Sequence, residues 1–337
     1  MTASLTTERA AELIGRFNDC RIAVVGDFIL DRYIWGRASR ISQEAPVPVV
    51  RVQRESASLG GAANVLRNIR SLGADASAFG VVGDDVGGGM VREFCRDAGI
   101  AATGVVTDPE RKTTVKTRVI AENQQVVRID DEIDTDVSAS IQEEVVHRLR
   151  QTMHQARLNA IIIEDYNKGM ISPKLATAIR DSAAARSVTV ALDPHPGNPV
   201  PVTGLAILTP NRSEAFAMSA TYYREPVKPF THDQALRNVG RNLMKQWRPE
   251  MLLITLGAGG MALFERDGEP HHIPTVAKEV FDVAGAGDTV IAAAVTSIAA
   301  GATPVEAAII ANHAGGIVVG KVGTASAGAD ELLDSFS

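Results

Sequence analysis

Short apolar runs and amphipathic stretches alternate along almost the whole chain. The apolar runs are typical of buried strands, and they occupy residues 21–26, 76–82, 160–164, 188–192, 205–208 and 251–256. The stretches between them space their apolar residues as helices do, at residues 60–72, 86–98, 172–185, 213–217, 232–247 and 290–300. This alternation predicts βαβ units, and therefore an α/β fold in which helices cover both faces of a mainly parallel central sheet.

Two segments depart from this alternation because no helix follows them. Residues 45–54 alternate like a half-exposed strand, and their prolines are typical of a sheet edge. Residues 113–130 read as two strands around a turn at Glu122-Asn123. We therefore predict a small antiparallel sheet that stands off the main body as a lid over a cleft, an oligomer surface, or both. Its strands would come from about residues 32–58 and 111–130.

The overall composition narrows the class of protein. With 337 residues, of which 45% are hydrophobic and 22% charged, the chain is an ordinary globular protein, and we predict a single domain over residues 1–337. The 34 basic and 40 acidic side chains give a net charge of −6, and no strongly basic segment indicates a nucleic-acid partner. The polar N-terminus lacks the apolar core of a signal peptide, and no apolar run reaches membrane-spanning length. Cys20 and Cys95 have no metal or redox spacing, so we expect two buried residues in a cytoplasmic protein.

A glycine-rich bend directly precedes the last of these predicted helices, in the stretch Asp282-Val-Ala-Gly-Ala-Gly-Asp-Thr289. Such a helix start offers unpaired N–H groups and the positive end of the helix dipole, so it attracts anions, and glycine lets a phosphate approach closely. Asp288 at this junction would repel a phosphate unless it takes a proton from a hydroxyl that attacks the phosphate. The alternative is an ordinary helix N-cap, a position that aspartate often occupies.

Two other segments carry groups that suit a polyol. Gly60-Gly61-Ala-Ala-Asn64 is a strand-to-helix junction with an amide side chain, which offers both donors and acceptors. The alternative is a tight turn with a capping asparagine. Asp31 follows the first predicted strand, at the edge where open α/β sheets bind ligands, and could accept two sugar hydroxyls. The alternative for Asp31 is a loop carboxylate in a salt bridge.

A magnesium motif and a basic segment complete the candidate chemistry. Asn211-Arg-Ser-Glu214 follows a predicted strand, and a glutamate at such a helix start can hold Mg²⁺, usually through water. The same spacing also suits a capping arrangement. The lid segment is basic, and cations over a cleft would suit a substrate-borne phosphate, although a solvated charged face is the default. Its basic residues are Lys112, Lys116, Arg118 and Arg128.

Two further glycine-rich segments resemble phosphate motifs, but each lacks an essential part. Residues 315–322 have the glycine and lysine spacing of a Walker A loop, but Val322 stands where a hydroxyl for Mg²⁺ is needed. Gly257-Ala-Gly259 follows a strand, but the chain continues as another strand, so there is no helix N-terminus for a pyrophosphate and we exclude NAD. Thr255 and Gly257 can still offer a hydroxyl and N–H groups to a phosphate.

Together these motifs resemble the PfkB-type (ribokinase-like) carbohydrate kinases over essentially the whole chain. The two signatures of that family correspond to residues 60–64 and 282–288, and Asn211–Glu214 matches its Asn-x-x-Glu magnesium motif. Finer features are similar to the D-glycero-β-D-manno-heptose 7-phosphate kinases, which act in ADP-heptose synthesis for the lipopolysaccharide inner core. These features lie at residues 27–31, 40–49, 116–118, 123–128, 165–169 and 320–324. Departures at Leu66, Asn167 and His195 affect details of the sugar and phosphate contacts more than the kinase assignment.

The resemblance implies that the γ-phosphoryl group of ATP is transferred to the anomeric 1-hydroxyl of heptose 7-phosphate, which gives the 1,7-bisphosphate. Asp288 would be the base, and the N–H groups from Gly285 to Gly287 would form an anion hole for the charge that develops on the phosphoryl group. Glu214 and Asn211 would hold Mg²⁺ through water next to ATP. A monovalent cation such as K⁺ is a further candidate.

The remaining binding residues follow from the same resemblance. The sugar hydroxyls would meet Asp31, Gly60, Gly61 and Asn64; the partner of the 7-phosphate would come from Lys116, Arg118, Arg128 and Lys168; and the nucleotide would lie along Asn211, Thr255, Gly257, Gly259 and Asn312. Many of these kinases are fused to a nucleotidyltransferase domain, and because the chain ends soon after Thr324 we expect the single-activity form. Val47, Val49 and Val126 would leave apolar surface on an isolated small sheet, so we expect a homodimer paired through the lids.

Two alternatives stay open at this stage. A related ribokinase-family kinase could use fructose phosphate, ribose or a nucleoside. A non-catalytic sugar or nucleotide sensor could share the fold, although the presence of Asp288, Asn211 and Glu214 argues against it.

Overall fold

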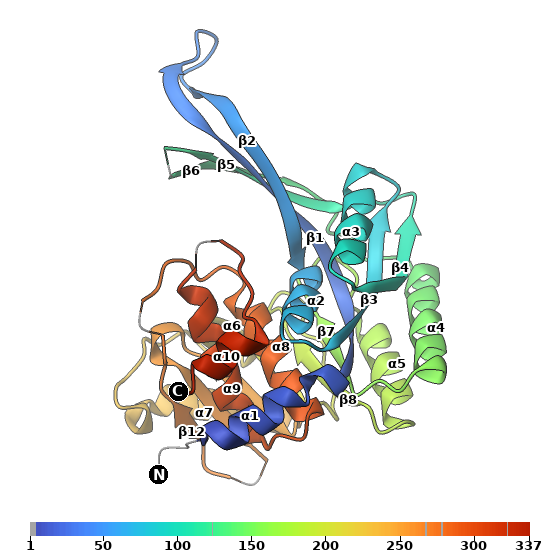
Figure 1. The fold of residues 1–337 in the computed structure, drawn as a ribbon, viewed down its shortest axis with the longest axis vertical. Coiled ribbons are helices and arrows are strands. Elements are labelled where there is room, and N and C mark those ends of the chain that lie inside the picture. Colours follow the sequence, from blue (N-terminus) through green and yellow to red (C-terminus); the bar gives the residue numbers. More distant parts are fainter. Residues whose placement is uncertain (1–4, 123, 267, 278, 322) are drawn as a thin grey trace.

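The central sheet is mainly parallel. The computed structural model describes residues 5–122, 124–266, 268–277, 279–321 and 323–337. Within these residues the strands form one 12-stranded sheet, whose main path follows the order β12-β11-β10-β9-β8-β7-β1-β3-β4 (Figure 1). Neighbours on this path are parallel except at β10–β11 and β11–β12, so the predicted sheet is confirmed. Its strands are β1 (Arg21–Ile41), β3 (Asp75–Gly83), β4 (Ala101–Asp108), β7 (Ala160–Glu164), β8 (Thr189–Asp193), β9 (Ile207–Leu208), β10 (Met251–Thr255), β11 (Met261–Glu265) and β12 (His271–Ile273).

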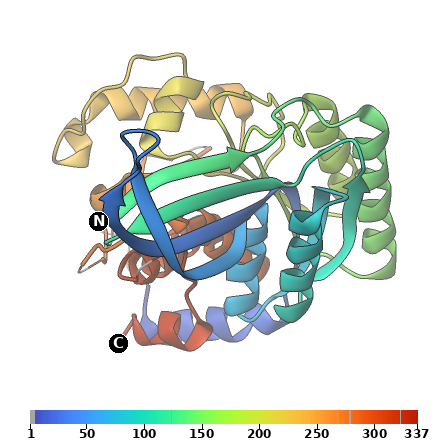
Figure 2. The ribbon, with the colours of Figure 1, turned by 90° about the horizontal axis from the view of Figure 1, so that it is seen from above.

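Helices cover both faces of this sheet, because the side chains of each strand alternate between two cores (Figure 2). In β1, Ile22 and Val24 join one core, whereas Ala23 and Val25 join the other. The first core includes buried residues of α1 (Thr7–Gly15), α2 (Ala62–Ser71), α3 (Val86–Asp97), α8 (Ala286–Ala299), α9 (Pro304–Val319) and α10 (Ala329–Asp334). The second includes those of α4 (Ala139–Gln155), α5 (Pro173–Ala184), α6 (Arg212–Met218) and α7 (Gln234–Trp247). The predicted α/β class is therefore confirmed.

Several elements have no counterpart in the sequence prediction, and β4 and α4 are two of them. β4 contains few large apolar residues, and parallel pairing with β3 holds it in the sheet. α4 begins after Ser138, whose hydroxyl accepts a hydrogen bond from the N–H of Ile141. Both elements extend the predicted alternation. Cys20 and Cys95 are buried free thiols, as expected.

The lid is a direct continuation of the central sheet and projects from the body of the molecule (Figure 1). β1 does not end at residue 26 but runs on to Ile41, because β2 (Pro48–Gly61) and β5 (Thr114–Ala121) pair with its outer half. The expectation that Asp31 lies in a loop past the first strand is therefore wrong. Asp31 lies within β1, opposite Ser58 of β2 and Lys116 of β5.

The pairing within the lid is mixed. β6 (Gln124–Asp131) and β5 form the predicted hairpin; Asn123 of its predicted turn lies outside the described residues. The β1–β2 and β5–β6 pairs are antiparallel, as expected. β1 and β5 run parallel, because both strands extend from the central body in the same direction.

The two faces of the lid differ in chemistry, because residues two apart on a strand point to the same face. The face that carries Asp31 is largely polar, and residues in register on its strands include Tyr33, Lys116, Arg118 and Arg128. The opposite face, called here the outer lid face, is mainly apolar: it carries Ile34, Val52, Val119, Val127 and Ile129 beside the exposed ion pair of Arg32 with Glu55. Val52, Val127 and Ile129 are 50%, 45% and 54% exposed, respectively.

Candidate active site

The candidate site lies where the parallel strands end and two helices begin. The carboxyl-terminal ends of β7 and β8 adjoin β1, while α2 and α8 approach from one side of the sheet. Gly285, with φ 76°, is the N-cap of α8, and the helix begins at Ala286 rather than at residue 290. Asp288 is therefore inside the first turn. The N-cap alternative is wrong for Asp288, because a glycine in the left-handed conformation starts the helix instead.

The carboxylate of Asp288 receives two side-chain hydrogen bonds. Tyr166 Oη donates to Asp288 Oδ1 at 2.7 Å, and Asn64 Nδ2 donates to Asp288 Oδ2 at 2.5 Å. Asp288 is only 7% exposed. Burial raises the pKa of Asp288 above its ordinary value, and the bonds from Tyr166 and Asn64 oppose this shift. The arrangement is that of an oriented carboxylate able to accept a proton.

Gly285 also allows α2 and α8 to meet. A Cβ atom at this position would lie 2.8 Å from Asn64 Nδ2, so a larger residue would separate Asn64 from Asp288. A Cβ at Gly287 would meet no atom within 4 Å, which leaves the space above the helix start open. Of the three predicted anion-hole groups, the N–H of Ala286 donates to the carbonyl of Val283 at 3.2 Å. The N–H groups of Gly285 and Gly287 have no acceptor among the described residues and stay available to an anion.

Two further carboxylates, the buried Glu164 and the half-buried Asp193, lie next to Asp288. Glu164 and Asp193 are opposite each other at the ends of β7 and β8, and ligand atoms of Glu164, Asp193 and Asp288 lie within 4.8 Å of one another. Burial, reinforced by the neighbouring carboxylates, raises the pKa of Glu164 and of Asp193 well above the ordinary carboxyl range. Thr209 Oγ1 donates to Asp193 Oδ1 at 2.8 Å, whereas Glu164 Oε2 is buried without a partner among the described residues. This set of hard oxygen atoms fits a divalent cation or a shared proton.

Glu164 and Asp193 were not among the site residues predicted from the sequence. Each is the final residue of its strand. Ligands of open α/β sheets bind outside the carboxyl ends of the strands, so a carboxylate at that end of a predicted strand was an available signal.

Asn211 and Glu214 form a reciprocal cap at the start of α6. The N–H of Glu214 donates to Asn211 Oδ1 at 3.0 Å, and the N–H of Asn211 donates to Glu214 Oε2 at 2.8 Å. The capping alternative is thus present in the structure. Glu214 is nonetheless near enough to Asp193 to raise the pKa of that carboxyl group. Its predicted metal role stays a prediction.

The candidate sugar residues surround Asp31, which is 6% exposed. Arg118 Nη1 lies 2.5 Å from Asp31 Oδ1, so the salt-bridge alternative is also present. A Cβ atom at Gly60 would overlap the Asp31 carboxylate, and Gly61 adopts φ 57° before α2. Gly60 therefore permits β2 to approach Asp31 closely, whereas a Cβ at Gly61 would meet the carbonyl oxygen of Asp27. The backbone N–H groups of Tyr166, Lys168 and Met170 bind the carboxylate of Asp27 instead, which gives Asp27 a structural role.

Three of the four basic side chains predicted to meet a substrate phosphate are paired with acids. They are Arg118 with Asp31, Arg128 with Asp130, and Lys168 with Glu132. Lys116 has no ion pair among the described residues. Burial, then the charges of Lys168 and Lys116, lowers the pKa of His195. Lys116 and Lys168 therefore lie near His195, and the lowered pKa of that imidazole favours its neutral form.

Arg67 is a cationic residue of the site that was not predicted from the sequence. Its Nη2 atom donates to Asn64 Oδ1 and to the carbonyl of Thr324, both at 2.6 Å. Asp282 Oδ2 accepts from the N–H of Gly323 at 3.1 Å, so the segment at 323–324 is held beside the site from two sides. A hollow of about 620 Å³ lies between this segment and the lid residues Tyr33 and Trp35. The helical spacing from Asn64 to Arg67 was the only sequence signal for this contact.

The candidate nucleotide residues are less clearly grouped. Thr255 forms a bridge with Asn211. Gly257 and Gly259 lie in the turn between β10 and β11, where the carbonyl of Gly259 meets His272 Nε2 at 2.8 Å. Asn312 is buried in α9, and its Nδ2 atom donates to the carbonyl of Pro274 at 2.7 Å. Asn312 thus has a structural contact, and its predicted place along the nucleotide stays a prediction.

The two excluded phosphate motifs have structural explanations. β10 and β11 form an antiparallel hairpin, so the glycines at 257–259 do not precede a helix, as expected. Residues 315–319 belong to α9, and Lys321 Nζ pairs with Glu331 at 2.7 Å. Val322 lies outside the described residues.

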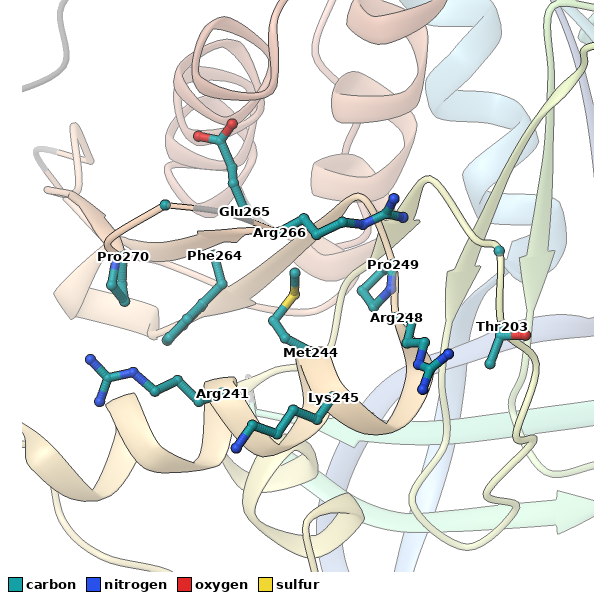
Figure 3. Close-up of a pocket in the computed structure, with 12 residues that line it drawn as sticks. Thr203, Arg241, Met244, Lys245, Arg248, Pro249, Phe264, Glu265, Arg266 and Pro270 are labelled. Carbon is teal, nitrogen blue, oxygen red and sulfur yellow. The ribbon is translucent and has the colours of Figure 1, made fainter.

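A separate hollow of about 740 Å³ lies beside the other end of the sheet, near the starts of β9 and β10 (Figure 3). Four cationic side chains line it: Arg241, Lys245, Arg248 and Arg266. Figure 3 shows Arg241 and Lys245 pointing to one side and Arg248 and Arg266 to the other, so they do not converge on one point. This hollow contains none of the groups that surround Asp288.

Comparison with known proteins now identifies the family. The sequence profile of the pfkB family carbohydrate kinases matches residues 20–331. The chain belongs to this family. As a pfkB-family kinase it is a phosphotransferase that acts on a sugar hydroxyl, and the family implies ATP and a divalent metal. Among the described residues, no helix is both long and apolar enough to cross a membrane.

The curated relatives of this kinase include longer proteins. The chain is 42% identical over 324 residues to the "Bifunctional protein HldE" of Geobacter metallireducens, which covers 96% of this chain and 64% of that relative. It is 41% identical over 321 residues to the protein of the same name from Geotalea uraniireducens, covering 95% and 64%, respectively. The chain thus spans somewhat less than two thirds of the length of these relatives.

Solved structures bear out the ribokinase-like fold. Arabidopsis thaliana ribokinase complexed with ribose and ATP is 19% identical, with a TM-score of 0.70 over 94% of this chain and 98% of that one. Phosphofructokinase-2 from Escherichia coli in complex with potassium is 16% identical, with a TM-score of 0.75 over the same shares. At these identities the likeness shows the fold alone.

Proposed function

We propose that this pfkB-family kinase transfers the γ-phosphoryl group of ATP to the anomeric hydroxyl of D-glycero-β-D-manno-heptose 7-phosphate, and so produces the 1,7-bisphosphate for ADP-heptose and lipopolysaccharide core synthesis. The observation that carries the proposal is the 2.5 Å contact between Asn64 Nδ2 and Asp288 Oδ2. It joins the segment expected to bind the sugar to the segment expected to bind the phosphate. An acceptor hydroxyl beside Asn64 would therefore lie next to the proposed base.

In the proposed reaction, Asp288 takes the proton from the anomeric hydroxyl as that oxygen forms a bond to the γ-phosphorus. The bond from the γ-phosphorus to its bridging oxygen breaks, and ADP carries away that electron pair. The free N–H groups of Gly285 and Gly287 stabilise the charge on the transferred group. An anomeric hydroxyl is more acidic than an ordinary alcohol, so an aspartate suffices as the base.

The carboxylates near Asp288 are the proposed metal residues. Glu164, Asp193 and Glu214 would hold Mg²⁺, because hard oxygen ligands suit this ion and Glu164 Oε2 lacks a partner among the described residues. When bound, Mg²⁺ neutralises phosphate charge. Asn211 would support Glu214 through their reciprocal cap. K⁺ is an additional candidate.

The preference for a phosphorylated heptose rests on Lys116 and Lys168, two cations near His195. Lys116 lies in the lid strand β5 opposite Asp31, and Lys168 follows β7. A phosphate there would gain charge-assisted hydrogen bonds, while Asp31, Gly60, Gly61 and Asn64 hold the sugar hydroxyls. The resemblance to heptose 7-phosphate kinases supports the same substrate.

A substrate panel and one substitution test this proposal. With ATP, we expect kcat/KM for the heptose 7-phosphate to exceed that for fructose phosphate, ribose or a nucleoside by orders of magnitude. Asp288→Asn should lower kcat by about 10²–10⁴-fold, the usual effect of losing a general base, with the KM for ATP largely kept. Near-wild-type turnover of that variant contradicts the role of Asp288, whereas preference for another sugar contradicts only the substrate.

A further inference from the structure

A chain of hydrogen bonds from α2 and a single bond from the segment after β7 converge on Asp288. Arg67 on α2 donates to Asn64 Oδ1 at 2.6 Å, and Asn64 Nδ2 donates to Asp288 Oδ2 at 2.5 Å. From the other side, Tyr166, which follows β7, donates to Asp288 Oδ1 at 2.7 Å. Each carboxylate oxygen of Asp288 therefore has its own donor.

Arg67 determines which way the amide of Asn64 points. A guanidinium group can only donate, and an ionised carboxylate can only accept. Asn64 lies between these two groups and satisfies both only when its oxygen faces Arg67 and its NH₂ group faces Asp288. Without Arg67, the amide could turn over and direct its oxygen at the carboxylate, which would remove the bond and add repulsion.

The geometry points to Arg67 and Tyr166 as positioning residues that hold the Asp288 carboxylate in the orientation required for proton transfer. This inference rests on the proposed role of Asp288 as the base. Donors on both oxygens prevent rotation of the carboxylate plane, and they occupy two of its roughly four lone-pair sites. The other sites stay free for the hydroxyl of the acceptor. Misplacing a catalytic group by about 1 Å can reduce the rate about 10²-fold. Holding the Asp288 carboxylate in place before the substrate binds should therefore have a measurable effect on kcat.

A purely structural role explains the contacts less completely. Arg67 also binds the carbonyl of Thr324, so it contributes to holding that segment. However, burial of Arg67 lowers its pKa, its Nε atom is buried without a partner among the described residues, and the charge of Asp288 is the largest factor that favours the cation. The charge of Arg67 therefore acts on Asp288 and not only on the segment that contains Thr324.

The test separates kcat from KM in two variants. Tyr166→Phe removes one hydroxyl, and Arg67→Met keeps an apolar side chain of similar reach without a donor. We expect each to lower kcat about 10- to 100-fold, with the KM for ATP within about 2-fold of the wild type. Arg67→Lys should recover part of the kcat lost in Arg67→Met, because an ammonium group can donate to Asn64. Arg70→Met and Tyr223→Phe are matched controls and should keep the wild-type kcat. Among the described residues, Arg70 on the same helix donates to Ala74 and Asp75, and Tyr223 is 48% exposed and packs against Phe216.

A second background distinguishes this inference from the proposed function. If Tyr166 acts through Asp288, Tyr166→Phe causes less than about a 2-fold further loss when added to Asp288→Asn. The inference is overturned if both Tyr166→Phe and Arg67→Met keep the wild-type kcat. It is also overturned if Tyr166→Phe lowers kcat by the same factor in the wild type and in Asp288→Asn. In either case, a low kcat of Asp288→Asn leaves the proposed function intact. Wild-type turnover of Asp288→Asn instead overturns the proposed function itself. If Arg67→Met does not fold, as judged by thermal unfolding, or if the double variant is too slow to measure, the kcat of Tyr166→Phe alone decides.

Discussion

Asp288 loses most of its contact with water, and two side chains replace the hydration that its charge requires. An aspartate at 7% exposure favours the neutral form unless donors compensate. Tyr166 and Asn64 provide that compensation, and neither is near Asp288 in the sequence. Burial and the charges of neighbouring carboxylates raise the pKa values of Glu164 and Asp193 well above the ordinary range, and Glu164 Oε2 has no partner among the described residues. Burial, charged neighbours and hydrogen-bond donors together thus set the proton affinity of each carboxylate in the site.

The raised pKa of Asp288 predicts how activity depends on pH. Burial raises this pKa above the ordinary value of 3.8, and only the ionised carboxylate can accept a proton. The value of kcat should therefore fall as the pH is lowered, with a midpoint above 3.8. Tyr166→Phe removes a bond that favours the ionised form, so its midpoint should move to higher pH. Profiles of kcat at saturating substrates test this, and a midpoint below 3.8 or unchanged in Tyr166→Phe contradicts it.

The beginnings of the helices use different local devices, which decide what each helix can bind. α6 and α9 begin with reciprocal caps, whereas α8 begins with a glycine in the left-handed conformation. A cap uses the N–H groups that an anion would need, but the glycine leaves them free. At α9, Glu306 also binds Arg9 of α1 at 2.8 Å, so its cap connects two helices. α8 is therefore suited to a phosphate and α9 to stability.

Glu306 gives a stability prediction at the level of these helices. The hydrogen bond from Arg9 is the largest cause that lowers the pKa of Glu306 to about 2, and the backbone of Thr303 adds to it. A lowered carboxyl pKa stabilises the folded protein above its unfolded value of 4.5, and this stabilisation is lost as the pH falls toward 2. Glu306→Gln removes the charge but keeps an oxygen that can cap the helix, so it should lower the free energy of unfolding at neutral pH by up to about 1 kcal/mol, the usual contribution of an ion pair.

Urea unfolding across the acid range tests the role of Glu306. The difference between wild type and Glu306→Gln should be constant near neutral pH and shrink below pH 4.5. Glu143→Gln, which changes a glutamate paired with Lys174 at the surface, is the control and should have little effect at any pH. A difference that grows toward acid pH contradicts the assignment.

For the whole molecule, the distribution of polarity on the lid is the main feature without an explanation inside one chain. A sheet over a polar ligand should direct polar groups inward, and the face with Asp31 does so. The outer lid face is mainly apolar, and Ile129 on it is 54% exposed. An exposed apolar face of a small sheet favours association with a partner of the same chemistry. A second copy of the chain supplies such a partner, and we propose a homodimer through the outer lid faces.

The proposed dimer can be tested by measuring the mass of the protein in solution. Light scattering at micromolar concentration should give twice the chain mass of 35.7 kDa for the wild type. Ile129→Asp should shift the protein toward the monomer, because the dimer would bury an unpaired charge. Gln125→Asp, at an exposed position of the same strand that pairs with Ile120 on the opposite, polar face, should leave the dimer intact. A monomeric wild type contradicts the proposal.

Much of the fold could be predicted from the sequence, because local periodicity decides whether a segment forms a strand or a helix. The strand at 160–164 and the helix at 234–247 followed from such patterns. The extension of β1 to Ile41 could not be read in this way, because pairing with β2 and β5 creates it. Likewise, β4 has a weak pattern and depends on β3.

The same division applies to the candidate site. The sequence by itself determined the glycine-rich start of α8, the presence of Asp288 on it and the motif at Gly60–Asn64, because these depend on neighbours within one or two turns. Only the tertiary structure decided that Asn64, Tyr166 and Asp288 meet, that Arg67 orients Asn64, and that Glu164 and Asp193 share one edge. The physical reason is distance along the chain: Asp288 and Asn64 are 224 residues apart, and only the packing of α2 against α8 brings them to 2.5 Å.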